Sequence, residues 1–227
     1  TKDVTAAMTD YKPEKPMKLN PSPEFTDKEV QEVASMINAA ERPIVYIGGG
    51  VTAARADDEV NKLIEIADMP ATYTLMAAGI IGWENPRNLG LIGMHGSIAA
   101  NKAVDRSDLV IALGARFSDR VALNPQRFAK KALKVQVDID TSEINKNVLV
   151  DCGVTADVKE FLQKLLPLIK KKDHKDWVAQ ATEWKKKTGD VKCQEATLHP
   201  SEIIHAVCDL TDKETIYVTD VGQHQMW

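Results

Sequence analysis

The sequence predicts an α/β fold, a parallel sheet with helices on both faces. Residues 44–47 and 109–113 form apolar runs that are too short for most helices and suit buried strands. Segments with apolar residues at helical spacing lie between these runs. Strands and helices that alternate in this way build a parallel sheet covered on both sides. The domain that they define spans roughly residues 26–170, without an internal repeat.

Composition and charge exclude several classes of protein. The 227 residues are 44% hydrophobic and 27% charged, which is ordinary for a protein that buries a core. A formal net charge of −4 argues against nucleic acid as a partner. No apolar run approaches membrane-spanning length and no signal peptide is visible, so no membrane partner and a cytoplasmic location are expected. Cys152, Cys193 and Cys208 are widely spaced, which excludes a disulfide framework or a zinc site.

The two ends predict a segment of a longer protein. Residues 1–25 are expected to be a linker from a missing N-terminal domain, because Pro13, Pro16, Pro21 and Pro23 alternate with lysines in an extended stretch. Residues 195–227 resume a helix-strand pattern, with a helix over 200–210 and a strand over 215–219. They are expected to be the truncated start of a further domain.

The first half of the predicted domain contains two strand-helix units. Thr26 opens a helix as its N-cap, and Glu29 three residues later completes a capping box. The strand at 44–47 ends in three glycines, and a helix over 54–67 follows. The second strand is predicted over 71–75.

The second half continues the alternation. A helix over 96–106 precedes the strand at 109–113. Strands are then predicted over 134–139 and 148–150, and Asp157 caps a helix that runs through 168.

Residues 171–194 predict a basic helical linker. Trp177 and Trp184 are seven residues apart and therefore share a helix face. The lysines leave two alternatives, an anionic partner or solvated charges on a helix that the tryptophans anchor to a neighbouring surface, and we favour the second.

Glycine-rich and polar loops follow the predicted strands. Gly48 to Ala53 match a G-x-G-x-x-A pattern, which brings phosphates close to the amino end of a helix. A nicotinamide site would add an acid after the next strand. That strand instead ends in Thr74-Leu75-Met76, which disfavours such a site.

The other loops add charged candidates. Arg116 and Arg120 follow Gly114 and suit a phosphate or a planar ring, and the alternative is a solvated surface turn. His95 stands between glycines, as a ligand contact or as a structural or solvated histidine. Asp138 and Asp140 share a strand face and suit ribose hydroxyls or a metal, unless they cap the next turn. No nucleophile-base pair is evident, so these loops predict a nucleotide-like ligand without catalytic machinery.

Several of these segments carry a resemblance to a known family. They are residues 2–4, 48–50, 74–76, 91–96, 114–121, 137–140 with 143–144, 157–159 and 219–227. In this order they resemble the large, catalytic subunit of acetolactate synthase (acetohydroxyacid synthase), a thiamine-diphosphate enzyme. The resemblance implies a Rossmann-like central domain that holds FAD in a structural role. The alternatives are the central domain of another thiamine-diphosphate carboligase or decarboxylase, or a stand-alone nucleotide-binding module.

The whole enzyme of that family condenses pyruvate with a second 2-oxoacid, with loss of carbon dioxide, in branched-chain amino-acid biosynthesis. The resemblance implies thiamine diphosphate and Mg²⁺ as its further cofactors, a homo-oligomer and a possible regulatory subunit. The catalytic and metal-binding residues of the family lie in its other domains. We therefore expect no catalytic or metal-binding residue here, and no activity from this polypeptide alone.

The resemblance also assigns binding residues. The expected FAD contacts are Gly48, Gly49, Gly50, Thr74, Leu75, Met76, Gly93, Met94, His95, Gly114, Ala115, Arg116, Asp119, Arg120, Val121, Asp138, Ile139 and Asp157. Gly222, Gln223 and His224 are expected near the diphosphate of thiamine diphosphate. Ser118 departs from the family, many members of which have a second aspartate before Asp119.

Overall fold

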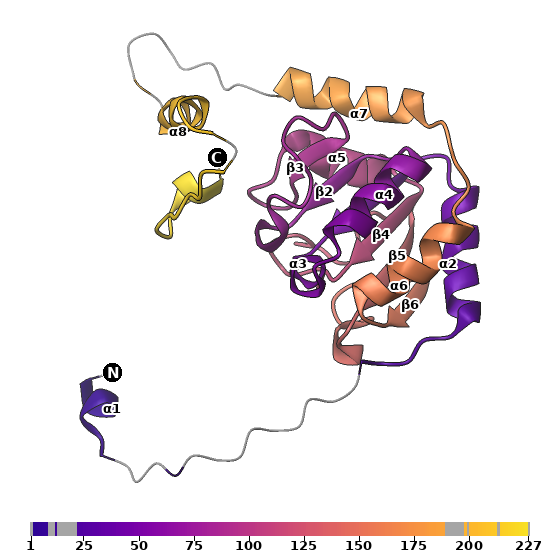
Figure 1. Ribbon diagram of the computed structural model, residues 1–227, viewed down its shortest axis with the longest axis horizontal. Coiled ribbons are helices and arrows are strands. Elements are labelled where there is room, and N and C mark those ends of the chain that lie inside the picture. The colour runs from indigo at the N-terminus through magenta and orange to yellow at the C-terminus, as the bar shows by residue number, and fades with distance from the viewer. Residues whose placement is uncertain are drawn as a thin grey trace.

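Six parallel strands form one sheet, in the order β3-β2-β1-β4-β5-β6 (Figure 1). The computed structural model describes residues 2–8, 12, 22–188, 198, 200–212 and 214–226. The strands are β1 (Pro43–Ile47), β2 (Ala71–Tyr73), β3 (Asn88–Leu91), β4 (Leu109–Leu113), β5 (Leu133–Asp138) and β6 (Cys152–Thr155). The predicted parallel α/β fold is confirmed.

Helices cover both faces of the sheet (Figure 1). The α-helices are α1 (Lys2–Ala6), α2 (Asp27–Ala39), α3 (Gly49–Ala54), α4 (Asp57–Ala67), α5 (Ile98–Arg106), α6 (Val158–Leu165), α7 (Lys175–Thr188) and α8 (Pro200–Asp209). Short 3-10 helices are η1 (Leu75–Ala77), η2 (Thr141–Glu143), η3 (Leu166–Leu168) and η4 (Gln223–Met226). The helices in the described part of the chain are too short or too polar to cross a membrane.

Alternate residues of the central strands point into two cores. Val45, Ile47 and Ile111 pack against α2, α3, α4 and α6 on one face. Ile44 and Val110 pack against α5 and α7 on the other. This period of two explains why the central strands are apolar throughout, since neither face meets water.

Local capping begins the helices where the sequence predicts it. The Thr26 hydroxyl accepts the N–H of Glu29, and the Glu29 carboxylate accepts the N–H of Thr26 at 2.7 Å. The Asp157 carboxylate accepts the N–H groups of Lys159 and Glu160 at the start of α6. Both predicted N-caps are confirmed.

The first half of the domain departs from the predicted bounds in two places. The helix predicted over 54–67 is divided, because Arg55 adopts a left-handed conformation with a φ of 52° between α3 and α4. The strand predicted over 71–75 ends at Tyr73, because η1 turns the chain from Leu75 onward.

The edge strands were the hardest to predict. The sequence predicts no strand at β3, which is only four residues long and contains a glycine. The strand predicted over 148–150 is wrong, since the chain pairs with β5 only from Cys152 to Thr155. Apolar Val148 instead packs as a buried loop residue.

The two ends are described only in part. Residues 2–6 form α1, and Pro13, Pro16 and Pro21 of the predicted extended stretch lie outside the described residues, so the linker stays a prediction. Residues 215–219 form no strand, because a strand needs the hydrogen bonds of a neighbour and none is paired with this described segment. The domain bounds drawn at 25, 170 and 194 stay predictions.

Helix α7 packs onto the sheet through its tryptophans. The Trp177 and Trp184 rings meet edge to face with centroids 5.8 Å apart, and Trp177 is buried. The Trp177 indole N–H donates to the Pro43 carbonyl at 2.9 Å, and the Lys185 ammonium donates to the Asn88 carbonyl at 2.8 Å. The prediction that the tryptophans anchor this helix to a neighbouring surface is confirmed.

The packing of α7 predicts that it stabilises the domain. Trp177→Ala should lower the free energy of unfolding by about 3–5 kcal/mol, because it empties a buried site and leaves a carbonyl unbonded. Lys187→Ala on the same helix, which removes only an exposed ion pair with Glu183, should change it by less than about 0.5 kcal/mol. Denaturant unfolding checks both, and equal effects would contradict an integral role for α7.

Candidate functional site

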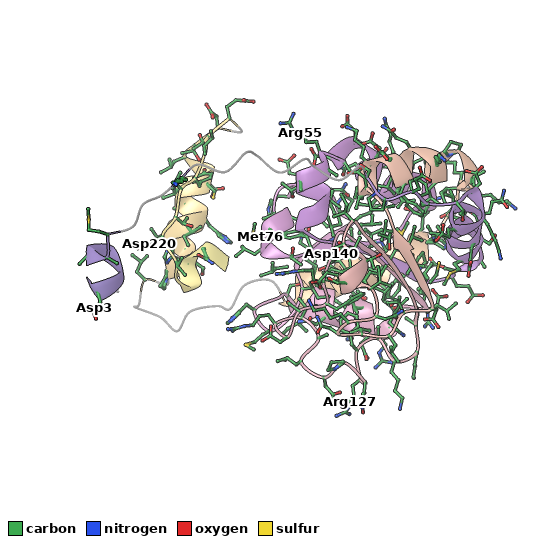
Figure 2. All side chains as sticks on the ribbon, turned by 90° about the horizontal axis from the view of Figure 1, so that it is seen from below. Asp3, Arg55, Met76, Arg127, Asp140 and Asp220 are labelled. Atoms are coloured by element: carbon green, nitrogen blue, oxygen red, sulfur yellow. The ribbon has the colours of Figure 1, made fainter. Side chains whose placement is uncertain are left out.

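A cavity of about 690 Å³ lies at the carboxyl ends of the strands. Ligand sites of small molecules and cofactors typically have volumes of roughly 300–1,000 Å³, and parallel sheets place them at this edge. Met76 follows β2 and Asp140 follows β5, yet Figure 2 shows them close together at one side of the domain. The strand-end loops therefore converge as the sequence predicts.

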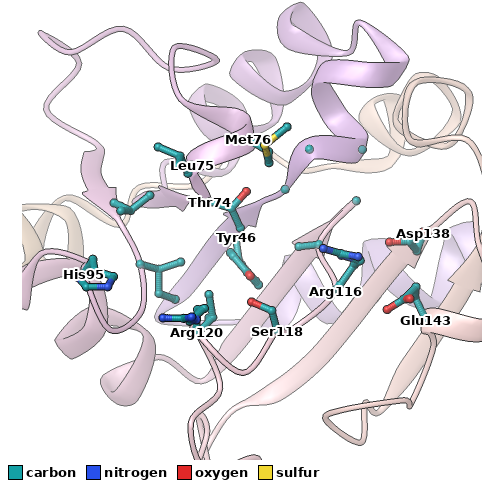
Figure 3. Close-up of a pocket in the computed structure, with 18 of the residues that line it drawn as sticks. Tyr46, Thr74, Leu75, Met76, His95, Arg116, Ser118, Arg120, Asp138 and Glu143 are labelled. Atoms are coloured by element: carbon teal, nitrogen blue, oxygen red, sulfur yellow. The ribbon is translucent and has the colours of Figure 1, made fainter. Parts of the chain in front are cut away.

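Most of the predicted contact residues line this cavity (Figure 3). They are Gly48, Gly49, Gly50, Thr74, Leu75, Met76, Met94, His95, Gly114, Ala115, Arg116, Arg120, Val121 and Asp138. Asp140, which the sequence offers as a ligand of ribose hydroxyls or a metal unless it caps a turn, also lines the cavity. Six further lining residues were not predicted as contacts: Tyr46, Leu91, Ile92, Ser118, Glu143 and Gln225. Tyr46 lies within β1, two residues before Gly48, and its buried position gives no sequence signal that separates it from a core residue.

Other predicted residues lie outside the cavity lining. Among the described residues these are Gly93, Asp119, Ile139, Asp157, Gly222 and His224, and the Gln223 side chain is not described. The Asp157 carboxylate is occupied as the N-cap of α6, and Ile139 is 54% exposed. Ligand contacts at these positions stay predictions.

Close packing of two loops explains the glycines after β1 and β4. The Gly48 N–H donates to the Leu113 carbonyl at 2.9 Å, and the Gly50 N–H donates to the Gly114 carbonyl at 3.1 Å. A Cβ on Gly48 would lie 2.0 Å from the Gly114 carbonyl oxygen, and Gly114 itself has a φ of 56°. Backbone contact thus requires these glycines, and several of their N–H groups are already bonded within the protein.

A second backbone contact holds the loop that contains His95 against the Arg120 carbonyl. Gly93 has a φ of 103°, and a Cβ there would lie 2.4 Å from the Arg120 carbonyl oxygen. The Met94 N–H donates to that same carbonyl at 2.8 Å. Gly93 therefore shapes the cavity wall without lining it, and His95 is exposed at the margin.

The turn after β4 is anchored by a buried aromatic ring and contributes residues to the cavity lining. Phe117 is buried, and its ring centroid lies 5.6 Å from that of Tyr46 and 5.5 Å from that of Phe128. Arg116 and Arg120 are exposed around this aromatic cluster and form no ion pair with another described residue. Both guanidinium groups are thus available to an anionic ligand.

The carboxylates of Asp138 and Glu143 lie beside Arg116 in the lining of the cavity (Figure 3). Asp138 is buried, and burial raises the pKa of its carboxyl, with Glu143 and Asp140 adding to the rise. The Asp140 carboxylate accepts the Ser142 N–H and caps η2, and hydrogen bonding from the side chain and then the backbone of Ser142 lowers the pKa of Asp140. The capping alternative is therefore confirmed for Asp140.

The remaining wall is apolar. Leu75, Met76 and Met94 all line the cavity and are 43%, 73% and 49% exposed, respectively. The nearby Thr74 hydroxyl is buried and has no hydrogen-bond partner within the described chain. The cavity thus suits a ligand with a planar apolar ring, anionic groups and one acceptor or donor for a hydroxyl.

Two observations concern possible catalytic groups among the described residues. Burial raises the pKa of the Cys152 thiol to about 11, so this thiol is not activated as a nucleophile. The described ranges also contain no cluster of three histidine, cysteine or acidic side chains suited to a metal.

The opposite pKa shifts of the two aspartates predict opposite mutant effects. Ionised Asp138 is disfavoured in the folded state, so Asp138→Asn should raise the melting temperature near neutral pH, and the gain should shrink as the pH falls towards about 3. Ionised Asp140 is favoured, so Asp140→Asn should lower the melting temperature near neutral pH, with a loss that also shrinks in acid. Thermal unfolding across pH checks the pair, and shifts of the same sign at neutral pH would contradict these environments.

Comparison with known proteins agrees with this geometry. Residues 30–165 match the family described as thiamine pyrophosphate enzyme, central domain. The chain is 36% identical to the acetolactate synthase large subunit of Lactococcus lactis over 91% of its length, and 36% identical to the isozyme 1 large subunit of Escherichia coli over 100% of its length. It spans only 36% and 40% of those relatives. The chain belongs to the family of thiamine pyrophosphate enzyme central domains, and it is similar to the large subunits of acetolactate synthases.

Proposed function

We propose that this chain is the FAD-holding central part of an acetolactate synthase large subunit. The observation that carries the proposal is the strand-end cavity, whose lining combines apolar side chains with two arginines that form no ion pair with a described residue. The similarity to acetolactate synthase large subunits, which extends over nearly the whole chain, supports the same conclusion.

The residues present fit FAD. The cavity volume of about 690 Å³ is in the range of cofactor sites. Arg116 and Arg120 would hold the diphosphate, and Leu75, Met76 and Met94 would pack against a ring system. The buried Thr74 hydroxyl lacks a partner in the described chain, and a bound polar group would supply one.

In the proposed enzyme the role of this segment is to bind and orient. FAD undergoes no net oxidation or reduction in the proposed reaction, and its role is structural. Thiamine diphosphate and Mg²⁺, bound mainly by other parts of the subunit, supply the carbon nucleophile that joins pyruvate to a second 2-oxoacid. Gly222, Gln223 and His224 are proposed to approach that diphosphate.

The same proposal implies a location, a pathway and an assembly for the enzyme. The enzyme would work in the cytoplasm, in branched-chain amino-acid biosynthesis, as a homo-oligomer with a possible regulatory subunit. The name "large subunit" of the relatives supports an assembly of more than one kind of chain. A native gene product near 25.0 kDa, measured by mass spectrometry, would contradict the placement of this chain within a longer subunit.

Removal of one arginine tests the binding site. Arg116→Ala in the complete subunit should weaken FAD binding by roughly 1.5–3 kcal/mol, about 10- to 150-fold, because a charged hydrogen-bond donor is lost. Arg127→Ala is the matched control, since Arg127 is exposed away from the cavity (Figure 2) and should leave the affinity unchanged. Flavin fluorescence titration measures both, and equal affinities for the two variants would refute the role of Arg116.

A separate assay tests the activity. The complete subunit should form acetolactate from pyruvate when thiamine diphosphate, Mg²⁺ and FAD are all supplied, and should lose this activity when FAD is removed. Retained carboligation without FAD would contradict a structural need for the flavin. Release of an aldehyde without carbon–carbon bond formation would favour a decarboxylase of the same family.

A further inference from the structure

We propose that the side-chain amides of Gln136 and Asn147 position Arg116 for the ligand of the cavity. Neither residue lines the cavity, and neither is predicted as a site residue from the sequence. This inference rests on the proposed function, since it concerns how the FAD site is organised.

Gln136 connects the loop after β4 with the turn after β5. It is fully buried in β5, where its side chain lies on the same face as that of Asp138. Its amide N–H₂ group donates to the Ala115 carbonyl at 3.2 Å and to the Glu143 carbonyl at 3.1 Å. One amide therefore holds together the loop that contains Arg116 and the η2 turn that contains Glu143.

Asn147 holds the other side of Arg116. Its amide donates to the Arg116 carbonyl at 3.0 Å, across 31 residues of sequence. The Asn145 side chain, on a residue with a φ of 60°, accepts the Val150 N–H at 2.8 Å and stabilises the loop from which Asn147 extends. The carbonyls of residues 115 and 116 are thus each bonded to a side-chain amide.

These two bonds matter because the guanidinium itself is unsupported. Arg116 forms no ion pair with another described residue, so the position of its charged end depends on its backbone. A backbone fixed before binding reduces the ordering cost that the ligand has to offset. The amides therefore act on affinity through Arg116 and not through contact with the ligand.

Substitution of Asn147 distinguishes a role in positioning Arg116 from a role in the stability of the fold. It is exposed, so Asn147→Ala removes little packing and should leave the melting temperature within about 2 °C of that of the unaltered protein. FAD affinity should nevertheless fall about three- to tenfold, because the Arg116 carbonyl loses its bond. Gln136→Met, which keeps the side-chain length, should weaken affinity too but also lower the melting temperature, since two buried carbonyls lose their donor.

A double-mutant cycle in the complete subunit, with FAD titrated by flavin fluorescence, tests the inference. If Asn147 acts through Arg116, Asn147→Ala should have no further effect once Arg116→Ala is present. Asn124→Ala is the control, because Asn124 is an exposed asparagine outside the cavity lining.

The outcomes separate this inference from the proposed function. Unchanged affinity in Asn147→Ala, or effects that add in the double variant, would overturn the positioning role while the FAD site stands. Failure of the unaltered protein to bind FAD would overturn the proposed function and this inference together.

Discussion

The backbone contact between Gly48 and Gly114 is the constraint on which the rest of the site depends. β1 and β4 pair in parallel up to Ile47 and Leu113, and the two N–H donations that follow carry this pairing beyond the strand ends. A side chain at either glycine would separate the loops. With the loops held together, the glycines after β1 and Arg116 after β4 line the same cavity.

The same arrangement divides the cavity by polarity. The lining that follows β2 and β3 is mostly apolar, with the Thr74 hydroxyl and the His95 imidazole as its polar groups, and Arg120 lies beside it because its carbonyl accepts the Met94 N–H. The strands on the β6 side end in Arg116, Asp138 and Glu143. A ligand that is apolar at one end and anionic at another matches this division, and FAD is such a ligand. Burial raises the pKa of Asp138, while hydrogen bonds from Ser142 lower that of Asp140, so the two acids of this wall differ in environment.

Sequence reasoning predicted those features that depend on local patterns. The strand at 109–113 was predicted with its observed bounds because both of its faces are buried and five apolar residues stand between Asp108 and Gly114. The capping box at Thr26 was predictable because it needs only residues three apart. The edge strand β6 was misplaced because its pairing depends on β5 rather than on its own pattern. Tyr46 was not predicted as a site residue because a tyrosine inside a buried strand has the same pattern as a core residue. The amide hydrogen bond to the Arg116 carbonyl could not be predicted from the sequence either, because it joins Arg116 to Asn147 across 31 residues.

Crystals of the complete subunit grown with FAD would test the account most directly. We expect electron density for the flavin nucleotide beside the Gly48–Gly114 contact, with its diphosphate on the guanidinium groups of Arg116 and Arg120. FAD bound elsewhere, or bound in this cavity with both guanidinium groups turned away from the diphosphate, would contradict the account.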